Sequence, residues 1–261
     1  MKAGTEILLK ENLKALNLSH MSTSLGTLVR QARENGTSHE DFLLALTEVE
    51  LQMRAESRLK RKLREAKFPL LKTLEQFDYR SAQELDKRLM HELESGDYLR
   101  SHRNIIFMGK SGTGKTHLAT GLGVAACRGG ISTRFVNGCG LSMELIEAQS
   151  ERRLSRVIQK YARYGLVVVD ELGYVPFSKE SAELMFQVLA ERHERGSVII
   201  TTNLGFADWT QVFGEATLTA ALLDRLTHKA HIINCTWESY RLKETLKARK
   251  DSIKGPKDNE E

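Results

Sequence analysis

Five short apolar stretches recur through the middle and the end of the chain. They lie at residues 104–108, 133–137, 166–170, 197–202 and 231–235. Segments with a helical spacing of apolar residues separate them, including residues 141–164 and 179–194. Nearly continuous apolar strands that alternate with helices are typical of a parallel sheet covered on both faces. The pattern therefore predicts an α/β domain with a parallel five-stranded sheet flanked by helices.

The beginning of the chain follows a different pattern. Apolar residues recur every three or four positions over residues 8–16, 25–32 and 42–53, with no strand-like alternation. The break at residues 35–38 ends in Ser38, which we expect to cap the helix that follows. This pattern predicts a small all-α N-terminal domain.

Changes in composition divide the chain further. Pro69 and the segment 77–80 indicate a linker, so we expect a helical domain over residues 1–67 and an α/β domain over residues 68–250. A helix over residues 81–93 is predicted before the first strand. The tail, residues 251–261, is polar and is predicted to be disordered.

A complete phosphate-binding motif follows the first predicted strand. Its sequence, Gly-Lys-Ser-Gly-Thr-Gly-Lys-Thr, fits the pattern G-x-x-x-x-G-K-[ST] between a strand and a helix. Such glycines let successive backbone N–H groups face one anion, and the helix N-terminus adds partial positive charge. Lys115 can reach the β- and γ-phosphates, and the Thr116 hydroxyl can bind Mg²⁺. We therefore expect a nucleoside triphosphate to be bound by Gly109, Lys110, Ser111, Gly112, Thr113, Gly114, Lys115 and Thr116.

Polar residues follow two later strands at the edge where the phosphate loop is expected. The third apolar stretch ends in Asp170 and Glu171, and the fourth is followed by Asn203. Asp170 is placed to hold Mg²⁺ through water, and Glu171 to polarise a water for attack on the γ-phosphate. Asn203 can hold that water or a γ-oxygen, although asparagine is also common in ordinary turns.

Two arginines lie on the helical segments near the end of the chain. They are Arg225 and Arg241. A guanidinium group can spread the charge that develops on a γ-phosphate, within one chain or across a subunit boundary. Both positions are equally typical of a surface arginine, so the spacing leaves the two interpretations open.

The composition bears on the cellular location of the protein. Its longest apolar runs have the length of strands, so we expect no membrane span, and the first ten residues lack the features of a secretion signal. The three cysteines, Cys127, Cys139 and Cys235, lack metal-site spacing and fit a reducing, cytoplasmic location.

Basic residues are concentrated in one segment. The formal charge is +5 and the pI is about 9.0, which makes a polyanionic partner plausible. Seven of the basic residues lie in residues 54–67 against two acidic ones. This segment is either a solvated helix face or a surface that contacts DNA phosphates.

Several other residues have ordinary structural interpretations. Met143 and Met185 are predicted to be core residues, and Trp209 and Trp237 to pack in the core or at an interface. The spacing of His117, His228 and His231 is poor for a metal site.

Together, these motifs resemble those of AAA+ ATPases, and the resemblance extends from about residue 8 to residue 250. More narrowly, residues 64–69, 72–78 and 170–174 resemble those of the IstB-like ATPases in the DnaC/IstB group of helicase loaders and transposition helpers. The resemblance implies ATP and Mg²⁺ as cofactors, with Thr116 and Asp170 at the metal. It implies a catalytic set of Lys115, Glu171, the sensor Asn203 and the arginine finger Arg225, with Arg241 as a second, nucleotide-binding sensor.

The same resemblance implies a function. It indicates an Mg²⁺-dependent ATPase that forms a homo-oligomer, binds duplex DNA and engages a transposase, with Arg225 acting on a neighbouring subunit. In such an assembly, the basic residues of the segment 141–164 can face either DNA or solvent. One alternative is a DnaC-type loader of a replicative helicase. A small-molecule kinase is another, but it would not need Glu171 or Arg225.

Overall fold

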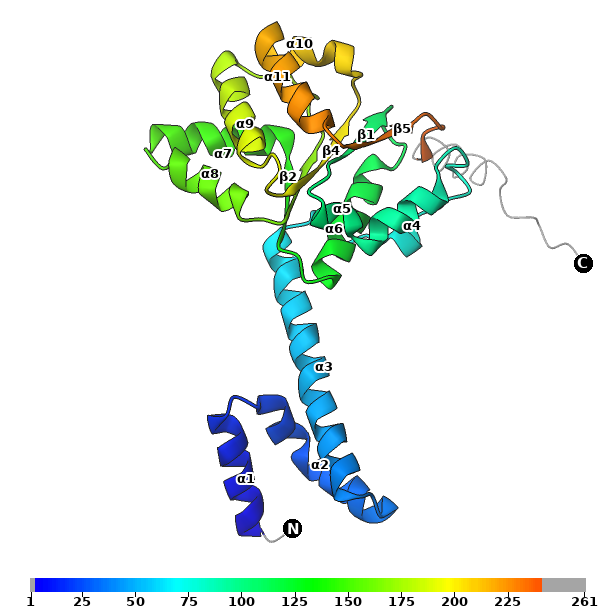
Figure 1. Ribbon diagram of the computed structural model, residues 1–261, viewed down its shortest axis with the longest axis vertical. Helices are drawn as coiled ribbons and strands as arrows, with labels where there is room; N and C mark the ends of the chain where they lie inside the picture. The colour runs from blue at the N-terminus through cyan, green and yellow to red at the C-terminus, as the bar shows by residue number, and fades with distance from the viewer. Residues whose placement is uncertain (1–2, 241–261) are drawn as a thin grey trace, which may run out of the picture. The chain divides into compact units, whose positions relative to one another are not determined.

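The structure, a computed structural model, describes residues 3–240 and separates into two compact units between Arg61 and Lys62 (Figure 1). The predicted site residue Arg241 and the predicted tail, 251–261, lie outside the described residues. Within residues 3–240, no helix is both long and apolar enough to cross a membrane.

The N-terminal unit is all-α, as predicted. It contains α1 (Ala3–Ala15), α2 (Ser19–Asn35) and most of α3 (His39–Ala66), which continues past the boundary between the units. The predicted cap is confirmed, because the Ser38 hydroxyl accepts a hydrogen bond from the Asp41 N–H at 3.1 Å. A small apolar core joins the helices through Met21, Leu25 and Leu46.

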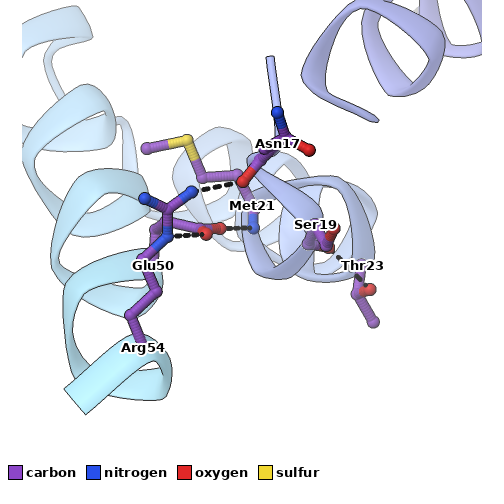
Figure 2. A network of polar contacts seen from close by, with 6 residues as sticks. All are labelled: Asn17, Ser19, Met21, Thr23, Glu50 and Arg54. Atoms are coloured by element: carbon purple, nitrogen blue, oxygen red, sulfur yellow. Dashed lines mark hydrogen bonds and ion pairs between the residues drawn. The ribbon is translucent and has the colours of Figure 1, made fainter. Parts of the chain in front are cut away.

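A buried carboxylate ties α2 to α3 in this unit (Figure 2). Glu50 is 3% exposed, and it accepts hydrogen bonds from the Met21 N–H at 2.8 Å and from Arg54 Nε at 2.7 Å. Arg54 also donates to the carbonyl of Asn17. These bonds hold the pKa of Glu50 below its ordinary value, although burial acts in the opposite direction. Arg54, the first residue of the basic segment 54–67, therefore has a structural role.

The second unit contains the predicted parallel five-stranded sheet. Its strand order is β2-β3-β4-β1-β5, and every neighbouring pair is parallel. Because β1 lies between β4 and β5, the loop after β1 opens beside the carboxyl end of β4. The strands are β1 (Ile105–Gly109), β2 (Thr133–Asn137), β3 (Leu166–Asp170), β4 (Ser197–Thr202) and β5 (His231–Cys235).

Alternate residues of the strands enter two separate cores. In β1, Ile105 and Phe107 pack against the face covered by α6, whereas Ile106 packs against the face covered by α9. Figure 1 shows helices on both sides of the sheet, which explains why the strands are apolar without interruption. The first face is covered by η1 (Leu74–Gln76), α4 (Lys87–Ser95), α5 (Asp97–Arg100) and α6 (Lys115–Arg128). The second carries α7 (Gly138–Ser150), α8 (Leu154–Ala162), α9 (Lys179–Glu191), η2 (Phe206–Asp208), α10 (Trp209–Phe213) and α11 (Ala216–Thr227).

Two predicted helices differ from the observed ones. The predicted helix over 141–164 is two helices, α7 and α8, separated at Arg152, which has a left-handed φ of 55°. The predicted helix over 81–93 begins only at Lys87, because the Asp86 carboxylate accepts the N–H groups of Arg88 and Leu89 and caps α4 there.

The predicted core positions are mostly confirmed. Met185, Trp209 and Trp237 are buried, but Met143 is 71% exposed. Met143 was wrongly predicted because it lies on the outer side of α7, whose buried residues are Gly138, Leu141, Ser142, Leu145 and Ala148.

Candidate nucleotide-binding site

Glycines shape the phosphate loop between β1 and α6. Gly109, Gly112 and Gly114 all have positive φ, at 147°, 82° and 91°. Gly114 immediately precedes α6, so the first N–H groups of that helix lie at the loop. A Cβ atom on Gly109 would lie 2.2 Å from the carbonyl oxygen of Cys235, so β5 leaves no space for a side chain there. The loop therefore has the backbone that an anion-binding turn requires.

The segment after β5 donates hydrogen bonds to carbonyl groups of this loop. The Trp237 indole Nε1 donates to the carbonyl of Thr113 at 2.7 Å, and the Tyr240 N–H donates to the carbonyl of Gly112 at 3.0 Å. The amino group of Lys115 donates to the carbonyls of Gly109 and Lys110, at 2.6 and 2.7 Å. These hydrogen bonds fix the backbone of the loop between β1 and α6.

Thr116 and Asp170 meet at the base of the loop. The Thr116 hydroxyl lies 2.9 and 3.2 Å from the two carboxylate oxygens of Asp170. The Thr201 hydroxyl donates to the same carboxylate at 2.6 Å. Asp170 is 6% exposed, and this burial raises its pKa above the ordinary value even though the two hydroxyls lower it. The oxygen donors of Thr116 and Asp170 fit the preference of Mg²⁺ for hard oxygen ligands.

Glu171 is oriented by residues from both neighbouring strands. It has a left-handed φ of 55°, and its N–H donates to the Thr201 hydroxyl at 2.9 Å. Its carboxylate accepts a hydrogen bond from Asn137 Nδ2 at 3.0 Å. Because Asn137 Oδ1 accepts the N–H of Cys139 at the start of α7, the amide nitrogen is left to face Glu171.

A cavity of about 590 Å³ brings many of the predicted residues together. This volume falls within the usual range for small-molecule sites. The phosphate loop from Ser111 to Thr116 lines it, together with Glu171 and Asn203. Asp170 does not line the cavity, but its carboxylate contacts the Thr116 hydroxyl. The other residues that line the cavity include Pro69, Leu70, Lys72, Gln76, Phe77 and Tyr240.

Arg225 is not part of this cavity. Its guanidinium carbon lies over the Phe186 ring, 4.6 Å from the centroid, and Nη1 is buried without a hydrogen-bond partner among the described residues. The side chain instead lines a separate cavity between the ends of α9 and α11. The predicted site residue Arg225 thus lies apart from the nucleotide cavity of its own chain.

Sequence reasoning missed Asn137 and Thr201. Asn137 ends β2 and Thr201 lies near the end of β4, on either side of β3. Both residues lie at or near the ends of predicted strands. Their contacts with Asp170 and Glu171 could be predicted only if the strand order β2-β3-β4 were already known.

The sheet order, the phosphate loop after β1 and the acidic pair after β3 define a P-loop nucleotide-binding domain of the AAA+ class. The fold resembles that of DnaA from Aquifex aeolicus, solved with AMPPCP bound, with a TM-score of 0.56 and 16% identity. That match covers 73% of this chain and 58% of the DnaA chain.

The chain belongs to the family of IstB-like ATP binding proteins, whose family model matches residues 11–248. It is 37% identical to the insertion sequence IS21 putative ATP-binding protein of Pseudomonas aeruginosa, over 90% of this chain and 89% of that protein. It is 35% identical to the corresponding IS232 protein of Bacillus thuringiensis subsp. berliner, over 93% and 97% of the two chains. The predicted family and fold class are thus confirmed.

Proposed function

We propose that this protein is an ATP-dependent helper of insertion-sequence transposition that assembles on duplex DNA and engages the transposase. The observation that carries the proposal is the cavity that joins the phosphate loop to Glu171 and Asn203. The names of the relatives, insertion-sequence putative ATP-binding proteins, support the link to transposition.

The arrangement is suited to ATP hydrolysis rather than to binding alone. Glu171 faces the cavity with its carboxylate oriented by Asn137, so it can align a water molecule with the γ-phosphate. Lys115 and the loop N–H groups can hold the phosphates, and Asn203 can contact the γ-phosphate or the water. Mg²⁺, held by Thr116 and Asp170, would neutralise charge on the β- and γ-phosphates.

Arg225 supports hydrolysis at subunit interfaces. Arg225 lies outside the nucleotide cavity of its own chain. We therefore propose that it stabilises the charge on the γ-phosphate bound to a neighbouring subunit. ATP would then bridge two subunits, which couples nucleotide binding to formation of the homo-oligomer.

Two basic segments support a polyanionic partner. The exposed residues of the first include Arg58, Lys60, Arg61 and Arg64 in α3 and Lys67 directly after it. Around the α7–α8 break, Arg152 and Arg156 are exposed, whereas Arg153 pairs with Glu151 and Lys160 with Glu144. We propose that the exposed arginines and lysines contact DNA phosphates, which would make binding strongly dependent on salt.

An ATPase assay with defined nucleic acids tests the proposal. We expect duplex DNA to stimulate hydrolysis more than single-stranded DNA, and Glu171→Gln to abolish turnover while ATP still binds. Stimulation by single-stranded DNA alone would favour a DnaC-type helicase loader instead. Hydrolysis that no DNA changes would contradict the proposal, and turnover that requires a small-molecule acceptor would indicate a kinase.

A further inference from the structure

A second group of polar side chains lies away from the nucleotide cavity. His193 and Glu194 follow the end of α9, and His228 follows the end of α11. One imidazole nitrogen from each histidine and one carboxylate oxygen of Glu194 all lie within 4.8 Å of one another. We propose that these three residues bind a borderline divalent transition-metal ion of the Zn²⁺ type.

The backbone that carries two of the three residues is held firmly. Arg192, directly before them, is 1% exposed, and its guanidinium donates to the carbonyls of Tyr161, Tyr164 and Ser197. These bonds fix the turn after α9, in which Glu194 has a left-handed φ of 58°. The ligands therefore extend from an ordered turn, which limits the entropy lost when a metal binds.

The third residue is held by the helix that precedes it. The His228 N–H donates to the carbonyl of Asp224 at 3.1 Å, which closes the last turn of α11. The two histidine rings already face one another, with centroids 5.7 Å apart and planes inclined at 47°. Both elements thus present imidazoles to the same point.

The ligand types and distances select the kind of metal. Two imidazoles and one carboxylate suit Zn²⁺ and its neighbours, whereas Mg²⁺ prefers oxygen ligands alone. Metal–ligand bonds of about 2.1 Å place the ligands of a tetrahedral ion about 3.4 Å from one another. Closing the set from separations within 4.8 Å therefore requires them to shorten by up to about 1.4 Å, which the exposed side chains of Glu194 and His228 can achieve by rotating.

The surroundings leave room for a further ligand and oppose tight binding. The residues line a cavity of about 240 Å³, in which water can complete the coordination. Glu194 supplies negative charge, but Arg192, Arg225 and Lys229 line the same cavity and repel a cation. We therefore expect Lys229→Ala to bind the metal more tightly than the unaltered protein does.

Cobalt titration tests the site directly. The full chain, free of affinity tags and nucleotide, is titrated with Co²⁺ and followed by visible absorption, and Zn²⁺ is then added in competition. We expect one saturable site from which Zn²⁺ displaces Co²⁺. Affinity should fall about tenfold or more in His193→Ala and in His228→Gln.

His91→Ala is the matched control, because the exposed His91 side chain on α4 pairs with Glu94 and belongs to no metal-ligand cluster among the described residues. It should bind Co²⁺ normally, as should Asp170→Ala, which alters the nucleotide site. Circular dichroism shows whether each variant is folded. Absence of saturable binding, or equal binding in the folded His193→Ala and His228→Gln variants, would overturn the proposal.

Discussion

Asp170 combines a candidate metal-binding role with an unfavourable position for its charge. Burial raises its pKa in the folded protein, so the folded state holds the proton more tightly than the unfolded chain does. Its stabilising contribution is therefore present below the pKa of the unfolded chain and is lost as the pH rises through the raised pKa. Above the raised pKa, the ionised carboxylate lowers the free energy of unfolding.

We expect Asp170→Asn, without nucleotide, to melt at a higher temperature than the unaltered protein at neutral pH. The difference should shrink as the pH is lowered through the carboxyl range. The same variant should lose Mg²⁺-dependent ATP hydrolysis, because it lacks the carboxylate. Thermal melting at several pH values checks the first effect, and a lower melting temperature at neutral pH would contradict it.

Asn137 has two roles that substitutions can separate. Its Nδ2 donates to Glu171, and its Oδ1 caps α7. We expect both Asn137→Ala and Asn137→Ser to reduce kcat about threefold to tenfold without weakening ATP binding, because Glu171 loses its orienting hydrogen bond.

Serine is a good cap for a helix N-terminus, so only Asn137→Ala should also lose about 1 kcal/mol of stability. Steady-state kinetics, nucleotide-binding titration and thermal melting distinguish the two effects. An unchanged kcat in both variants would show that Glu171 does not depend on Asn137.

Single residues of this site differ in how readily the sequence predicts them. The residues of the phosphate loop, Asp170 and Glu171 are recognisable because each motif occupies one continuous segment. Asn137 and Thr201 contact the acidic pair only through the pairing of β2 and β4 with β3, which is long-range information. The contact of Arg225 with Phe186 likewise depends on how α11 packs against α9.

Among the elements, α6 packs against η1 at a position where Gly121 leaves room for Leu74. A Cβ atom at Gly121 would lie 2.6 Å from Leu74 Cδ2 and 3.1 Å from its backbone nitrogen. Gly140, on α7, has no such neighbour within 4 Å. These helical glycines form a matched pair that separates helix propensity from packing.

We expect Gly121→Ala to destabilise the protein by about 1–3 kcal/mol through overpacking. Gly140→Ala should be neutral or stabilising by up to about 1 kcal/mol, because alanine is the better helix former. Urea unfolding of both variants provides the comparison. Equal effects in the two variants would show that α6 tolerates a side chain against Leu74.

The sequence predicts strands more accurately than helix ends in this protein. All five predicted strands coincide with observed ones to within one residue, because each is a short apolar run with distinct limits. The break between α7 and α8 has no comparable signal, since the left-handed residue there is Arg152 rather than glycine. Residues 81–86 of the predicted helix over 81–93 are not helical, because Asp86 caps α4 directly before Lys87.

At the scale of the whole molecule, the proposed shared site predicts complementation between subunits. Glu171→Gln and Arg225→Ala should each be nearly inactive in hydrolysis alone. A mixture of the two should regain activity, because Arg225→Ala subunits retain Glu171 and Glu171→Gln subunits supply Arg225. Phosphate release measured over a range of mixing ratios tests this, and a mixture no more active than its components would contradict a shared site.

We propose that ATP drives assembly of this protein on duplex DNA. The most direct test is sedimentation velocity with a fluorescent duplex, with and without ATP, alongside Lys115→Ala as the variant impaired in phosphate binding. We predict that a fast-sedimenting complex of several subunits and DNA forms with ATP, and that it is absent without ATP or in Lys115→Ala. Identical sedimentation of the duplex under all three conditions would contradict the claim.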